Sequence, residues 1–262
     1  MSERFEGKIE TGERLEQRPL IVGIVGCLGS GKTTLAGELG RRWGITPIEE
    51  NYPANPFLRD YYDNLSPSGY NKYSFKSQLF FLTSKIEQLK QMGNHASIVD
   101  PSLTMDYCYA KTHNKLGWMS DDEWHLYQDV FYTLSSQENI KYPDIHIAVT
   151  ADFNDLQKRI FSRGRDYEMS VLERCPEYLS KLDEAVLEWA SAEKDKSYVF
   201  IANTSGDHLK ESVNQLSSRI ESHIAAKFFG KLKLPNIPVR GLQNDYQDIV
   251  PGASSESTRL QR

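Results

Sequence analysis

The chain has 262 residues, of which 39% are hydrophobic and 26% are charged, with a formal net charge of −5. This composition is typical of a globular protein with a sizeable core, and its mixed charges argue against a nucleic-acid or membrane-surface partner. No apolar run approaches the roughly 18 residues of a membrane span, the first 18 residues do not resemble a secretory leader, and the three cysteines lack a C-x-x-C spacing. We therefore expect a cytoplasmic protein with free thiols, no membrane contact and no zinc site.

Short apolar runs alternate with longer helical patterns along the chain. The runs are continuously apolar and rich in β-branched residues, which is typical of parallel strands buried on both faces. They cover residues 20–25, 45–49, 96–100, 144–149 and 198–202. Helical spacing covers residues 32–43, 73–92, 119–136, 152–161, 178–192 and 207–226, the last with Asp207 as a candidate N-cap. Five strands joined by helical crossovers predict a doubly wound α/β domain with a parallel sheet flanked by helices.

The composition also suggests how the chain is divided. We expect an N-terminal extension at residues 1–18, one folded domain at residues 19–228 and a C-terminal tail at residues 229–262. The tail is rich in Pro, Gly, Ser and Gln, so it has too little apolar surface to order itself, and we expect it to be largely irregular.

The first functional signal is GCLGSGKT at residues 26–33, which matches G-x-x-x-x-G-K-[ST] between a predicted strand and a predicted helix. Glycines let backbone N–H groups turn toward an anion, and the helix N-terminus adds partial positive charge. Lys32 would reach the β- and γ-phosphates, and the Thr33 hydroxyl would hold Mg²⁺. The alternative is a plain glycine turn. We expect a nucleoside triphosphate to be bound by Gly26, Gly29, Ser30, Gly31, Lys32, Thr33 and Thr34.

A basic cluster, RIFSRGRDYE, provides the second signal. Arg159 and Arg163 are four residues apart on a predicted helix, and Arg165 lies just past Gly164. Three guanidinium groups could converge on one phosphoryl group, with Arg163 and Arg165 closest to the chemistry. The alternative is a solvated basic helix end, which the helix dipole favours.

Carboxylates at strand ends provide the third signal. Glu49 and Glu50 follow the second strand, and Asp100 ends the third. In open α/β sheets ligands bind at the carboxyl ends of the strands, so these acids should face the same crevice as the glycine loop. One could accept a proton from an attacking hydroxyl, and another could hold Mg²⁺. Ordinary turn or capping roles are the alternative.

Several segments together resemble the deoxynucleoside kinase family over residues 19–225. They are IEENYPANPFLRDYY, YSFKSQLFFLTSKIEQL, IVDPSLTMDYCYA, RIFSRGRDYE and IANTSGD, in this order behind the glycine loop. The resemblance implies a three-layer P-loop kinase fold, and it places Glu50 as the general base. It also places Asp100 near Mg²⁺, Arg159, Arg163 and Arg165 in a lid, and Asp207 beside the donor adenine.

The resemblance further implies an acceptor site. Gln78 would read the nucleobase edge and Asp106 would orient that recognition, while Tyr62 and Glu168 would hold the sugar 3′-hydroxyl. We place Phe81 and Lys85 with these substrate residues, and Phe81 and Tyr107 are candidates to sandwich the base, although aromatic residues at helical spacing are usually core.

Two positions depart from the family pattern. Residue 101 is Pro where the family usually has Arg, and residue 85 is Lys where many members have Arg. Proline supplies no donor, so a cation expected beside the acceptor hydroxyl is missing. Another cation substitutes for it, the acceptor differs, or activity is weak.

The combined interpretation is a kinase that passes the γ-phosphoryl group of ATP to the 5′-hydroxyl of a (deoxy)nucleoside with Mg²⁺. The resemblance also implies a homodimer. One alternative is a nucleoside monophosphate kinase. Such an enzyme would need an extra cation for the acceptor phosphate, and Pro101 does not supply one. The other is a catalytically weakened relative that serves as a regulatory or assembly subunit, which Pro101 favours and the retained Lys32 and Glu50 oppose.

Overall fold

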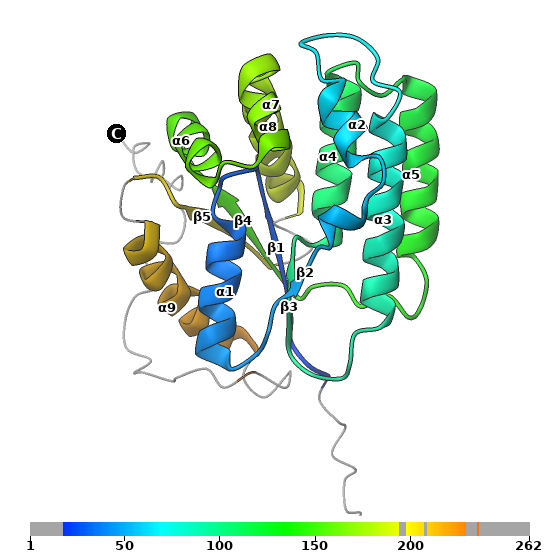
Figure 1. The fold of residues 1–262 in the computed structure, drawn as a ribbon. Coiled ribbons are helices and arrows are strands. Elements are labelled where there is room, and N and C mark those ends of the chain that lie inside the picture. The colour runs from blue at the N-terminus through cyan, green and yellow to red at the C-terminus, as the bar shows by residue number, and fades with distance from the viewer. Residues whose placement is uncertain (1–17, 194–197, 207–208, 229–234, 236–262) are drawn as a thin grey trace, which may run out of the picture.

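The computed structural model describes residues 18–193, 198–206 and 209–228, together with residue 235 (Figure 1). Residues 1–17, most of the expected tail and Asp207 lie outside this range. The division into extension, domain and tail therefore stays a prediction.

A five-stranded parallel sheet forms the centre of the domain. The strands are β1 Ile21–Gly26, β2 Ile48–Glu49, β3 Ser97–Asp100, β4 Ile145–Thr150 and β5 Tyr198–Asn203, in the spatial order β2-β3-β1-β4-β5. In the register, Ile24 lies opposite Ile147, and Val22 lies opposite Ile98. The predicted strands are confirmed. The second is shorter than expected, and Pro47 directly before it has no backbone N–H for the ladder.

Nine helices are described around the sheet. They are α1 Lys32–Trp43, α2 Leu58–Asp63, α3 Ser74–Lys90, α4 Leu103–Lys115, α5 Asp121–Ser135, α6 Phe153–Arg163, α7 Asp166–Arg174, α8 Glu177–Glu193 and α9 Leu209–Phe228, with a short 3-10 turn at Tyr52–Ala54. Six of them match the predicted helical segments to within two residues at each end. The sequence missed α2, α4 and α7. The helices α2 and α7 are short, and short helices depend on tertiary packing more than on their own pattern. The longer α4 buries polar residues such as Asp106 and His113, so its apolar stripe is interrupted.

The helices cover both faces of the sheet and complete three layers. On one face of β1, Val22 and Ile24 pack in a core with Leu39 of α1 and Ile220 of α9. On the other face, Val25 packs in a core with residues of α4 and α8. Figure 1 shows α1 beside α9 on one side, and α3, α4 and α5 grouped on the other. Burial of β1 on both faces explains its continuous apolar run.

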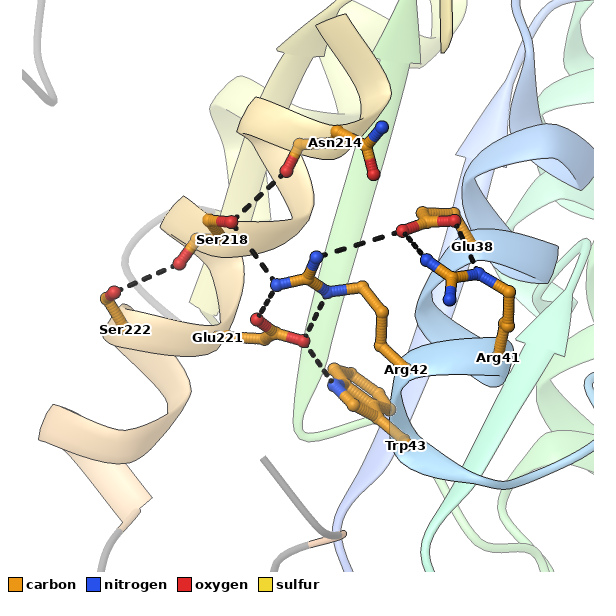
Figure 2. Close-up of polar contacts among 8 residues, drawn as sticks. All are labelled: Glu38, Arg41, Arg42, Trp43, Asn214, Ser218, Glu221 and Ser222. Carbon is orange, nitrogen blue, oxygen red and sulfur yellow. Dashed lines mark hydrogen bonds and ion pairs between the residues drawn. The ribbon is translucent and has the colours of Figure 1, made fainter. Parts of the chain in front are cut away.

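A buried carboxylate of α9 forms hydrogen bonds and an ion pair with side chains of α1. Glu221 of α9 is 3% exposed, and it accepts hydrogen bonds from Nε of Arg42 at 2.7 Å and from Nε1 of Trp43 at 3.1 Å. Arg42 also donates to Ser218 Oγ at 3.2 Å and lies 3.8 Å from a carboxylate oxygen of Glu38. Figure 2 shows these side chains meeting between the two helices. This contact anchors the last described helix of the domain.

Glu221→Ala is expected to lower the free energy of unfolding by about 1–3 kcal/mol, because it leaves the buried Trp43 donor and the half-buried Arg42 donors without their acceptor. Urea denaturation measures this change. Ser222→Ala, at the exposed neighbouring position on α9, is the matched control and should stay within about 0.5 kcal/mol of the native protein. An equal loss in both variants would contradict the assignment.

Candidate active site

The main cavity lies at the carboxyl ends of the strands and has a volume of about 180 Å³. Its walls come from the glycine loop, from the ends of β2 and β3 and the residues that follow them, and from α1, α2, α3, α4, α6, α7 and α8. The predicted site residues that line it are Gly29, Lys32, Thr33, Glu50, Tyr62, Gln78, Phe81, Asp100, Asp106, Arg163, Arg165 and Glu168. Most of the candidate site is therefore brought together by the fold.

The glycine loop between β1 and α1 has the geometry of an anion cradle. A Cβ at Gly26 would lie 2.3 Å from the carbonyl oxygen of Val149 in β4, so only glycine fits there. Gly31 has φ +96° and precedes α1 without a side-chain cap, so the first N–H groups of the helix are left for an anion. Lys32 Nζ donates to the carbonyls of Gly26 at 2.8 Å and Cys27 at 2.9 Å, and burial lowers the pKa of Lys32. The loop fits a polyphosphate.

The remaining loop residues lie around this cradle. Ser30 is fully buried and its carbonyl accepts a hydrogen bond from Thr204 Oγ1 at 2.6 Å. Thr33 and Thr34 open α1 with exposed side chains, and Thr33 lines the cavity. The loop is thus fixed on one side by the strand β5 region and open on the other.

Asp100 and Thr33 offer oxygen ligands suited to Mg²⁺. Asp100 ends β3, is 3% exposed, and its Oδ1 is buried with no hydrogen-bond partner among the described residues. No group of three His, Cys, Asp or Glu side chains with metal-ligand geometry occurs in the described ranges. Mg²⁺ bound with phosphates needs only one or two protein ligands, because water and phosphate oxygens complete its shell. The residues present therefore fit this ion.

Glu50 follows β2 directly and stands in the cavity wall. Its backbone N–H donates to the carbonyl of Asp100 at 3.2 Å, and its Oε1 lies 3.7 Å from Nζ of Lys85. Burial raises the pKa of Glu50, while the charges of Lys85 and Lys32 act in the opposite direction. Glu50 is thus a partly desolvated carboxylate near the phosphate loop. A general base needs such a position and a raised pKa.

Gln78 and Asp106 are buried polar residues of the cavity wall. Gln78 on α3 is 3% exposed and Asp106 on α4 is 2% exposed, and the described residues offer no hydrogen-bond partner to Gln78 Oε1 or Asp106 Oδ2. Burial raises the pKa of Asp106 well above its ordinary value, and the nearby charge of Glu50 acts in the same direction. Unpaired buried polar atoms that line a cavity are the kind of group that recognises a ligand.

Two of the three expected arginines reach the cavity. Arg163 lies 2.5 Å and Arg165 3.2 Å from the two carboxylate oxygens of Glu168. Arg159 is not among the described lining residues and instead donates to Thr204 Oγ1 at 3.0 Å and the Gly29 carbonyl at 3.4 Å. The expected convergence of three guanidinium groups is therefore not present in this structure. Arg159 lies one helical turn before Arg163, where the loop after β5 and the glycine loop engage its donors.

The aromatic residues divide between cavity and core. Tyr62 and Phe81 line the cavity, in accord with their expected placement. Tyr107 was a candidate stacking partner, but its ring packs against Trp124 and Phe131 of α5, at centroid distances of 5.2 and 5.1 Å. The prediction that Phe81 and Tyr107 stack on the two faces of a base is therefore wrong, because helix α5 covers the face of α4 that carries Tyr107.

Sequence reasoning missed further residues in the cavity wall. Three of these are the tyrosines Tyr52, Tyr167 and Tyr178, which come from three separate segments. The Tyr52 ring lies under the guanidinium of Arg165, with 4.8 Å between the guanidinium carbon and the ring centroid. No spacing in the chain signals these contacts, because each tyrosine reaches the cavity only through the packing of distant elements.

A family model described as deoxynucleoside kinase matches residues 22–225. The chain belongs to the deoxynucleoside kinase family. Members of this family use ATP to phosphorylate a hydroxyl group of a deoxynucleoside. The family resemblance expected from the sequence is thereby confirmed.

Individual relatives agree with this assignment. The chain is 31% identical to the deoxyadenosine kinase of Dictyostelium discoideum over 170 residues, which cover 64% of this kinase and 65% of the relative. It is 28% identical to the deoxyguanosine kinase of Bacillus subtilis over 151 residues, covering 57% and 70% of the two chains. The aligned stretch thus spans about two thirds of each curated relative.

A solved structure supports the fold in the same way. The deoxyadenosine kinase of M. mycoides with bound dCTP superimposes with a TM-score of 0.66 at 27% identity, covering 78% of this kinase and all of that chain. The predicted three-layer P-loop kinase fold is confirmed. These relatives are named as kinases, which supports the enzyme interpretation over a regulatory subunit.

Proposed function

We propose that this kinase transfers the γ-phosphoryl group of ATP to the 5′-hydroxyl of a (deoxy)nucleoside bound in the main cavity. The observation that carries the proposal is the lining of this cavity. It joins the phosphate-loop lysine Lys32, the half-buried carboxylate Glu50 and the buried polar pair Gln78 and Asp106. A phosphate donor, a proton acceptor and a recognition site thus share one space.

On the donor side, the glycine loop and Lys32 would hold the β- and γ-phosphates, and Arg163 and Arg165 would neutralise charge on the group in transfer. Asp207, which lies outside the described residues, is proposed beside the adenine. Thr33 and Asp100 would hold Mg²⁺, which when bound offsets the negative charge of the phosphates.

On the acceptor side, Gln78 and Asp106 would bind the base edge, and Tyr62 and Glu168 the sugar 3′-hydroxyl. The 5′-hydroxyl oxygen would form a bond to the γ-phosphorus as the bond to the bridging β,γ-oxygen breaks and ADP leaves. Glu50 would accept the hydroxyl proton.

A screen with labelled ATP tests the proposal. The native protein, with and without Mg²⁺, is offered the four common deoxynucleosides, their ribonucleoside counterparts and the deoxynucleoside monophosphates. We expect Mg²⁺-dependent monophosphate formation from at least one deoxynucleoside. Transfer only to monophosphates would identify the monophosphate kinase alternative, and ATP binding without any transfer would identify the regulatory subunit.

Gln78→Leu is expected to raise the acceptor KM while ATP affinity stays unchanged. A buried base edge would lose its partner, at a cost of about 1–3 kcal/mol for each hydrogen bond. Steady-state kinetics and calorimetry with ATP measure both quantities. Thr83→Val, on the exposed side of the same helix, is the control. Unchanged acceptor kinetics for Gln78→Leu would place the base elsewhere.

We further propose that the protein is a cytoplasmic homodimer that acts in nucleotide salvage. The acidic composition and free cysteines support the location, and the family resemblance supports the dimer. In the structure, no described helix combines the length and apolarity needed to cross a bilayer. Light scattering coupled to size exclusion measures the oligomeric state, and a monomer mass would contradict the dimer.

A further inference from the structure

Thr204 is a buried polar residue that follows β5 directly and contacts the glycine loop. It is fully buried, and its backbone N–H donates to the carbonyl of Thr150 at 2.9 Å, which continues the pairing of β5 with β4. Its Oγ1 lies 2.6 Å from the carbonyl oxygen of Ser30 and 3.1 Å from that of Thr150. A hydroxyl has one hydrogen to donate, and the shorter distance assigns that hydrogen to Ser30. One side chain therefore links the sheet to the glycine loop.

This hydrogen bond sets the orientation of one peptide group in the loop. The peptide between Ser30 and Gly31 is trans, so its carbonyl oxygen and its N–H point in opposite directions. Because the carbonyl is turned toward Thr204, the N–H of Gly31 points away from Thr204. Within the described ranges that N–H has no acceptor, and it lies beside the uncapped first N–H groups of α1. It is thus a donor available to an anion.

The glycine at position 31 makes such a restraint necessary. Gly31 has φ +96°, a left-handed conformation that glycine adopts easily. Glycine populates several backbone regions at similar cost, so the peptide that precedes it can turn over unless its carbonyl is held. A peptide that turned over would present a carbonyl oxygen to the phosphates in place of an N–H.

Arg159 of α6 holds the Thr204 hydroxyl in turn. Its Nη1 donates to Thr204 Oγ1 at 3.0 Å and to the Gly29 carbonyl at 3.4 Å, and its Nη2 donates to the Thr204 carbonyl. The bond from Arg159 uses Oγ1 as an acceptor, which leaves the hydroxyl hydrogen for Ser30. The loop also packs closely on α6, since a Cβ at Gly29 would lie 2.8 Å from the carbonyl oxygen of Leu156. Contacts from β5 and α6 thus converge on one hydroxyl group.

We propose that Thr204 is a positioning residue for the anion cradle, whose hydroxyl holds the Ser30 carbonyl so that the Gly31 N–H faces the bound phosphates. The side chain acts through Ser30, because Thr204 is fully buried and is not among the described residues that line the main cavity. This inference rests on the donor side of the proposed function. A threonine with a purely structural role would affect stability and leave phosphate affinity unchanged.

Thr204→Val tests the role, because it keeps the shape of the side chain and removes the hydroxyl. Inorganic tripolyphosphate is the probe, since it offers phosphate groups without a base or a sugar. We expect calorimetry to show about 10-fold weaker binding of tripolyphosphate and of Mg²⁺–ATP, with the acceptor KM nearly unchanged. Thr204→Ser, which keeps the hydroxyl, should bind both ligands nearly as the native protein does.

Ser205→Ala is the matched control in the same loop. Ser205 Oγ accepts a hydrogen bond from the N–H of Asp152 at 2.8 Å, and in the described part of the chain it makes no hydrogen bond to the glycine loop. The variant should lower the melting temperature, as Thr204→Val should, but leave the affinity for tripolyphosphate unchanged. An equal loss of affinity in the two variants would overturn the proposal. Unchanged affinity in Thr204→Val, or a Thr204→Ser variant as weak as Thr204→Val, would overturn it as well.

Thr204→Ala keeps the proposal testable if Thr204→Val does not fold, because it removes the same hydroxyl and needs less space. Unchanged affinity in that variant would also overturn the proposal. A native protein that binds neither ATP nor tripolyphosphate would overturn the proposed function and this inference with it. Native ATP binding without transfer to any acceptor would overturn the proposed transfer alone, whereas native transfer with full phosphate affinity in Thr204→Val would overturn this inference alone.

Discussion

Lys32→Ala is expected to abolish measurable phosphoryl transfer and to weaken ATP binding. The variant removes the ammonium that the glycine loop holds at the start of α1, so the charge on the β- and γ-phosphates would lose a fixed cation. Calorimetry with Mg²⁺–ATP and a single-turnover assay measure the two effects separately.

Arg41→Ala is the matched control for this variant. Arg41 lies on the same helix, is exposed and pairs with Glu38 on its own helix, so its loss should leave transfer intact. If Lys32→Ala instead bound ATP as the native protein does and retained full turnover, the glycine loop would be only a turn between β1 and α1.

Glu50→Gln is expected to lower kcat by about 10²–10⁴-fold with a modest change in nucleotide binding. The amide keeps the shape of the side chain but cannot accept the proton of the acceptor hydroxyl. Initial-rate kinetics with a deoxynucleoside that the native enzyme accepts, together with calorimetry of ATP binding, measure the expected split.

Glu49→Gln provides the comparison, since Glu49 precedes Glu50 but has a more exposed side chain. An equal loss in both variants would show that neither carboxylate is the specific base. If the native protein bound ATP with Mg²⁺ but phosphorylated no acceptor, and Glu50→Gln changed nothing, the regulatory-subunit alternative would replace the kinase proposal.

Several features of this protein could be predicted from the sequence because they depend on neighbouring residues. The phosphate loop is one, since the positions of Gly26, Gly31 and Lys32 encode both the backbone conformation and the charge that a phosphate needs. The strands are another, because burial on both faces leaves a continuous apolar run such as that of β1. Family membership followed from several such local segments in a fixed order.

Only the tertiary structure decided how distant segments meet. The short helices α2 and α7 owe their stability to packing, so their own residues carry a weak signal, and the buried polar residues of α4 interrupt its apolar stripe. Arg159 and Arg163 lie on one helix, yet the loop after β5 engages the first and Glu168 the second. Lys85 meets Glu50 because Gln88 of α3 donates a hydrogen bond to the end of β2. Side-chain partners of this kind are set by packing between elements far apart in the chain, and a linear pattern does not contain that geometry.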